Sequence, residues 1–213
     1  MILGKGVNTM PIAAKYRLEE FFMKLFEKEN DNRDYVLENI KKKYNDEYIV
    51  DKEIPVPYRQ IYIPKDKNVE LEVWCFKQDI CIYKTLYEKN IKSGDASINC
   101  SNKAIVKIKL EKDSDKSDVA LPLLIIETKM AKTVNTHELL AYSEKVQMIK
   151  TIFPYCKYLL LLFGKPPKRA YLHGLNFDRI IGIEELSDNE LKHLHKIIND
   201  ELFEVKESIS NIK

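Results

Sequence analysis

A run of eight apolar residues at positions 119–126 constrains this 213-residue chain most, because it holds no charge and ends directly before Glu127. Short apolar runs rich in Leu and Ile are typical of strands buried on both faces of a sheet. Side chains two apart in a strand share a face, so Glu127 and Lys129 are predicted to project together, with Thr128 facing the other way. A buried carboxylate and ammonium are costly unless they pair or bind something. The end of this strand is therefore the first candidate for chemistry.

The setting of the Glu-Thr-Lys sequence distinguishes it from two other Glu-x-Lys matches, at 190–192 and 204–206. Both of those lie in a stretch of helical periodicity, where residues two apart point in different directions. Only the sequence at 127–129 ends an apolar strand. With the apolar residues before it, this segment resembles the motif strand of the PD-(D/E)xK nuclease superfamily, which includes many restriction endonucleases, Holliday-junction resolvases and RecB-like nucleases. The resemblance covers about residues 95–163.

The resemblance implies a fold and a reaction. The implied fold is α/β, with a mixed central sheet flanked by helices and a restriction endonuclease-like core. The implied reaction is hydrolysis of a DNA phosphodiester bond with Mg²⁺, or Mn²⁺, as cofactor. In this superfamily two acidic groups and a strand carbonyl hold the ion, and a lysine helps to orient or activate a water molecule. Glu127 would be one metal ligand, Thr128 would offer its backbone carbonyl, and Lys129 would be the catalytic lysine.

The second acidic ligand has two candidates, Asp95 and Asp118. Asp95 stands at the start of an expected strand, as the family's aspartate does, but it follows Gly94 where the family often has proline. Asp118 lies nine residues before Glu127. If the intervening segment is one extended strand, its ends are about 30 Å apart at about 3.3 Å per residue, too far for one ion to bridge. Asp95 is therefore favoured as a catalytic, metal-binding residue, and Asp118 remains the alternative.

Periodicity along the rest of the chain indicates the α/β class. Helices are expected at 13–29, 33–44, 135–153 and from 187 onward, and strands at 69–82, 104–110, 158–163 and 180–183. Asn135 with Glu138, and Ser187 with Glu190, predict capping boxes at two helix starts. Three prolines between positions 55 and 64 predict an extended, partly irregular segment. The strand–helix–strand order around 119–163 predicts a right-handed crossover with parallel pairing.

Length and composition bound the remaining possibilities. The chain is expected to form a single nuclease-like domain over 1–213, with 1–50 as a helical N-terminal portion. Thirty-five basic and 33 acidic residues give a net charge of +2. Proteins that only coat nucleic acid are usually much more basic, whereas a DNA enzyme can have such a low net charge. Four cysteines without metal-binding spacing favour reduced thiols and a cytoplasmic location. The apolar runs are too short for a membrane span, so no membrane partner is expected.

Lys165, Lys168 and Arg169 surround two prolines after the strand expected at 158–163. Basic residues at the end of a sheet are suited to contact the phosphate backbone, so we expect them to bind double-stranded DNA. By analogy with restriction enzymes of this kind, we expect the chain to form a homodimer.

RecB-like relatives carry a Gln-x-x-x-Tyr motif on the helix after the lysine. In this chain Gln147 is followed four places later by Thr151, which does not support that subgroup.

The favoured interpretation is a type II-like restriction endonuclease, and two others stay open. A resolvase or repair nuclease would use the same chemistry. A non-catalytic nucleic-acid-binding protein could keep a nuclease-like core, and Gly94 in the place of proline supports that interpretation. A small-molecule α/β enzyme is disfavoured, because none of the six glycines forms a phosphate-binding loop.

Overall fold

The computed structural model describes the backbone of residues 32–44, 47–65, 68–85, 96–100, 104–110 and 120–210, and side chains for 32–44, 47–59, 74–84 and 121–209. The helix predicted at 13–29 lies outside the described residues, as do Asp95 and Asp118. Of the predicted helical portion 1–50, the structure describes helix α2 (Asn32–Tyr44) and the start of the first strand.

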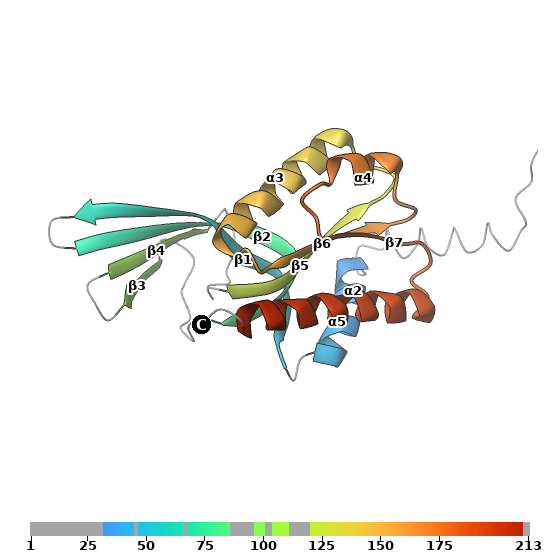
Figure 1. The fold of residues 1–213 in the computed structure, drawn as a ribbon, viewed down its shortest axis with the longest axis horizontal. Helices are drawn as coiled ribbons and strands as arrows, with labels where there is room; N and C mark the ends of the chain where they lie inside the picture. The colour runs from blue at the N-terminus through green and yellow to red at the C-terminus, as the bar shows by residue number, and fades with distance from the viewer. Residues whose placement is uncertain are drawn as a thin grey trace, which may run out of the picture.

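The described strands form one mixed sheet of seven strands (Figure 1). They are β1 (Ile49–Lys65), β2 (Asn68–Thr85), β3 (Ala96–Cys100), β4 (Ala104–Leu110), β5 (Ala120–Met130), β6 (Lys157–Phe163) and β7 (Arg179–Ile183). The order is β3-β4-β2-β5-β6-β7, with β1 on the other side of β2. β2 pairs antiparallel with β1 and β5, whereas β5, β6 and β7 run parallel. The predicted mixed sheet and parallel crossover are confirmed.

Strand β2 divides the sheet into two parts because it has different neighbours along one edge. Its residues 80–85 pair with β5, whereas its residues 69–75 pair with β4. We call the first part the body (β1, β2, β5, β6 and β7) and the second part the arm (β1, β2, β4 and β3). In Figure 1 the arm extends away from the helices. Asp79 lies between these two pairings, where the body meets the arm.

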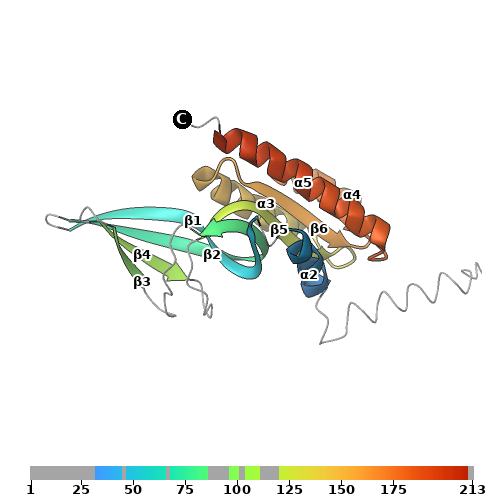
Figure 2. The ribbon, with the colours of Figure 1, turned by 90° about the horizontal axis from the view of Figure 1, so that it is seen from below.

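Helices cover both faces of the body. α3 (Thr136–Ile152) and α4 (Lys168–His173) lie on one face, and α2 and α5 (Asp188–Ser210) on the other (Figures 1 and 2). Leu159 and Leu161 of β6 pack in the core under α2 and α5, whereas Leu160 and Leu162 pack in the core under α3 and α4. Burial on both faces explains why this strand is apolar without alternation. No described helix has the length and apolar character needed to cross a membrane.

The local signals in the sequence predict most element boundaries. Asn135 caps α3 with a reciprocal capping box to Glu138, and Glu190 accepts from the backbone N–H of Ser187 at the start of α5. The segment with three prolines is extended and partly irregular, as predicted, because it is part of strand β1 and has a register shift between Pro57 and Arg59. Among the described strands β1 pairs only with β2, and prolines within sheets are found mainly in edge strands and at bulges.

Candidate functional site

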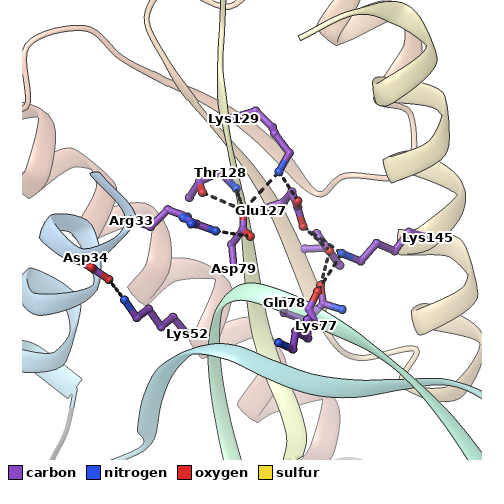
Figure 3. A network of polar contacts seen from close by, with 11 residues as sticks. Arg33, Asp34, Lys52, Lys77, Gln78, Asp79, Glu127, Thr128, Lys129 and Lys145 are labelled. Carbon is purple, nitrogen blue, oxygen red and sulfur yellow. Dashed lines mark hydrogen bonds and ion pairs between the residues drawn. The ribbon is translucent and has the colours of Figure 1, made fainter. Parts of the chain in front are cut away.

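Strand β5 carries Glu127 and Lys129 to the α3 face of the sheet (Figure 3). Ile125, two residues before Glu127, packs in the core under α3. The Lys129 Nζ lies 2.8 Å from Glu127 Oε1, and Glu127 is only 3% exposed. The prediction that these two side chains project together is confirmed. Because the carboxylate is buried, its interactions determine what the site can bind.

Asp79 of β2 is a second acid beside this pair, and sequence analysis did not identify it. The β2–β5 pairing ends at Ile80 and Ile126, and Asp79 comes next on β2. Asp79 Oδ2 accepts hydrogen bonds from the Thr128 backbone N–H and hydroxyl, both 2.9 Å away, and lies 3.6 Å from Lys129 Nζ. The carboxylate thus supplies an acceptor where the two strands diverge. It also brings a second acid to the amine that holds Glu127.

The structure brings together Asp79, Glu127, Thr128 and Lys129. Asp95 and Asp118, the two predicted partners of Glu127, lie outside the described residues. Strand β3, which follows Asp95, belongs to the arm and is separated from β2 by β4. A sequence signal for Asp79 does exist, because it stands directly before an apolar run, 80–83, whose residues are all buried.

Two further cations reach the acids from the helices on opposite faces (Figure 3). Arg33 of α2 places Nη1 3.1 Å from Asp79 Oδ1. An ion pair between Asp34 and Lys52 links the start of α2 to β1 beside it. From α3, Lys145 places Nζ 3.2 Å from Glu127 Oε2. Each oxygen of both carboxylates therefore has at least one donor.

The site has a surplus of one positive charge. Three cations face two carboxylates in the set formed by Arg33, Lys129, Lys145, Asp79 and Glu127. Burial by itself raises the pKa of Asp79, but Lys129, the Thr128 hydrogen bonds and Arg33 outweigh it, so the pKa is lowered. Burial lowers the pKa of Lys129, but Glu127 and Asp79 outweigh it, so the pKa is raised. Asp79 and Lys129 are therefore both charged at neutral pH. A site with surplus positive charge and several N–H donors suits an anion such as a phosphodiester.

Tyr158, on the neighbouring strand β6, contacts Glu127. Its buried hydroxyl lies 2.6 Å from Gln78 Oε1 and 3.3 Å from Glu127 Oε2. A phenol has one hydrogen to donate, and the shorter contact assigns it to Gln78. Burial, together with the charges of Glu127 and Asp79, raises the pKa of Tyr158, so the hydroxyl stays protonated. The Tyr158 hydroxyl therefore lies against Glu127 while it donates to Gln78.

The basic segment after β6 lies at the same edge of the sheet as Lys129. β5 and β6 are parallel, with Met130 opposite Phe163, so the residues that follow each strand emerge together. Lys165, Lys168 and Arg169 are all exposed. The Arg169 Nε donates to the Val134 carbonyl at 3.0 Å, which ties the start of α4 to the loop after β5. Their contact with DNA remains a prediction.

The donor set of the site is compatible with a hard divalent ion. Mg²⁺ prefers oxygen ligands, and it is usually held by one or two carboxylates while it keeps several waters. Asp79 and Glu127 supply two carboxylates that both contact the Lys129 amine, and Thr128, which carries the third predicted oxygen ligand, follows Glu127 on β5. Within the described part of the chain, no group of three or more His, Cys, Asp or Glu residues is placed to hold a metal ion.

Comparison with models of known protein families gives no match for this chain, and comparison with curated proteins gives none either.

Proposed function

We propose that this chain is a Mg²⁺-dependent endonuclease of the PD-(D/E)xK type that hydrolyses DNA phosphodiester bonds, as a type II-like restriction endonuclease. One observation carries the proposal. Two largely buried acids, Asp79 and Glu127, contact the amine of Lys129 at the point where β2 and β5 diverge. An acid–acid–lysine set at the end of a core strand is what the resemblance of residues 121–129 implies, with Asp79 in the place expected for Asp95.

Asp79 and Glu127, with the backbone carbonyl of Thr128, would hold Mg²⁺ or Mn²⁺. When bound, such an ion lowers the pKa of a coordinated water and offsets charge on the scissile phosphate. Lys129 is protonated, so it acts as a hydrogen-bond donor and a positive charge rather than as a base. It can stabilise the charge that develops on the phosphate in the transition state. Arg33, which has 36% of its side chain exposed, would add a second positive charge near the phosphate.

The proposed substrate is double-stranded DNA, and the proposed assembly is a homodimer. Surplus positive charge at the site and the basic residues Lys165, Lys168 and Arg169 at the same sheet edge support binding to the phosphate backbone. Two copies of the chain would supply one site for each strand. A resolvase or a repair nuclease would use the same groups, and a fold alone does not separate these roles.

A non-catalytic nucleic-acid-binding protein is the second candidate. It is favoured by the fact that Lys129, Lys145 and Arg33 already engage both carboxylates, with no third metal-type ligand beside them in the described part of the chain. In such a protein the cations would bind phosphate and the acids would only orient the cations.

Plasmid cleavage in the presence of Mg²⁺ tests the proposal. The Lys129→Met variant should lose at least about 100-fold in cleavage rate, because it removes a charge that stabilises the transition state. Lys192→Met, on the exposed side of α5, is the matched control and should cleave like the parent. A Lys129→Met variant that folds and cleaves at the parental rate would refute the assignment. DNA binding without cleavage in Mg²⁺ or Mn²⁺ by the parent would favour the second candidate.

A further inference from the structure

We infer that Lys145 is a positioning residue of this site, which holds one oxygen of Glu127 and places a fixed positive charge beside the ion-binding oxygens. This inference rests on the proposed function. It assigns the two lysines that contact Glu127 to different tasks. Lys129 lies on the strand motif, whereas Lys145 comes from α3, sixteen positions further along the chain.

The two lysines contact different oxygens of Glu127. Lys129 Nζ lies 2.8 Å from Oε1 and 3.6 Å from Asp79 Oδ2, so it stands between the two acids. Lys145 Nζ lies 3.2 Å from Oε2. A cation shared by both acids would have to replace Lys129 in that position. Lys145 engages the other oxygen, so it can keep its contact while Oε1 binds an ion.

The position of Lys145 does not depend on Glu127 alone. Its Nζ also donates to the Lys77 carbonyl at 3.2 Å, and it lies 5.6 Å from the Phe76 ring centroid and 5.9 Å from that of Tyr142. Ammonium groups are attracted to aromatic faces at such distances. Only 15% of the side chain is exposed. These contacts would hold the charge in place when Glu127 changes its partner.

Two opposite effects follow from a fixed ammonium at this point. A positive charge a few ångströms from a divalent ion repels it, so Lys145 should weaken ion binding. The same charge favours the negative phosphate and keeps Glu127 oriented, so Lys145 should speed the reaction. A purely structural lysine would not produce tighter metal binding together with slower cleavage when it is replaced.

The experiment measures Mn²⁺ binding to the full chain by electron paramagnetic resonance, and plasmid cleavage in parallel, for Lys145→Gln, Lys145→Arg and Lys150→Gln. Lys145→Gln keeps a hydrogen-bond donor but removes the charge. We expect it to bind Mn²⁺ about tenfold more tightly and to cleave more slowly, with Lys145→Arg closer to the parent in both. Lys150 is the matched control, because it is also on α3 and pairs with its own acid, Asp178, at 2.7 Å.

The outcomes separate the two claims. If Lys145→Gln binds Mn²⁺ no more tightly than the parent, while the parent and Lys150→Gln bind Mn²⁺ and cleave DNA, the role of Lys145 is refuted and the proposed function stands. If the parent binds no Mn²⁺, the proposed function fails and the inference fails with it. A rise in affinity in Lys150→Gln equal to that in Lys145→Gln would also refute the inference, because the effect would then not depend on position.

Discussion

Among the described side chains, two glutamates are almost completely buried, and each contacts two cations. Glu127 is 3% exposed and contacts Lys129 and Lys145. Glu201 of α5 is 2% exposed, and it lies 2.7 Å from Arg179 Nε and 3.2 Å from Lys157 Nζ. By burial and by the number of ion pairs, the two sites are alike.

The two sites differ in the second acid that the lysine of each site contacts. Lys129 also contacts the second acid of its site, Asp79, whose side chain is only 15% exposed. Lys157 also contacts Glu204, whose side chain is 55% exposed and stands in solvent. A buried ion pair is by itself weak evidence for any role. Two buried acids that share an amine are better evidence, because they place several oxygens where one ion could replace the amine.

The Glu201 cluster has a structural explanation. Lys157 begins β6 and Arg179 begins β7, so the cluster joins α5 to the amino ends of two parallel strands. Lys129 lies near the carboxyl end of β5, at the opposite edge of the sheet. The comparison therefore predicts that the Glu127 cluster takes part in catalysis and that the Glu201 cluster holds α5 against the sheet.

The largest expected effect is the contrast between Glu127→Gln and Glu201→Gln. Removing the Glu127 charge should reduce DNA cleavage by at least about 1,000-fold, because it removes a metal ligand. Glu201→Gln should leave cleavage per folded molecule unchanged and lower the free energy of unfolding by about 2 kcal/mol. That value is below the usual cost of breaking a buried pair, because Arg179 is more than half exposed. Urea unfolding and plasmid cleavage measure the two quantities.

An equal loss of cleavage per folded molecule in both variants would remove the distinction between the two glutamates. Circular dichroism of each variant serves as the control that the helices and strands are retained.

An intermediate effect is expected for exposed lysines on opposite faces of the sheet. Replacing Lys165 and Lys168 together by alanine should weaken DNA binding, and it should reduce the slope of log K against log salt by about one for each lysine that contacts a phosphate. The matched control replaces the exposed Lys192 and Lys196 of α5, a helix that covers the opposite face of the sheet from α4. Fluorescence anisotropy at several salt concentrations measures both. A larger loss in the α5 variant would place the DNA on the other face.

The smallest expected effect is on stability in acid. The pKa of Asp79 is lowered in the folded state, below its unfolded value of about 3.9. Asp79 therefore stabilises the fold above about pH 4, and this contribution is lost as the pH falls through the lower, folded pKa. The difference in unfolding free energy between the parent and Asp79→Asn should shrink by about 1 kcal/mol between pH 7 and pH 3. A difference that is constant with pH would mean that Lys129 and Arg33 do not lower the pKa of Asp79 in the folded state.

The strands and helices show which structural features a local sequence pattern can predict. The apolar runs of β5 and β6 predict both strands, because residues buried on two faces lose the polar alternation of a surface strand. The capping box of Asn135 predicts the start of α3, since a cap depends on residues only three apart. The prolines of β1 predict that this segment is extended and partly irregular, but they do not predict its pairing with β2, because pairing depends on residues outside the segment.

The candidate site divides in the same way. Glu127 and Lys129 are two residues apart on one strand, so their shared face follows from strand geometry. Asp79 lies 48 positions before Glu127, and it becomes a neighbour only through the register of β2 on β5. Arg33 and Lys145 come from helices on opposite faces, and no spacing in the chain links them to the strand motif.

The sequence by itself determined the α/β class, most of the described helices and strands, and the glutamate–lysine pair, because each depends on residues that are close together in the chain. Only the tertiary structure decided which acid stands beside Glu127 and which cations reach it. Pairing of β2 with β5 and packing of α2 and α3 bring these residues together, and both depend on contacts between segments far apart in the chain.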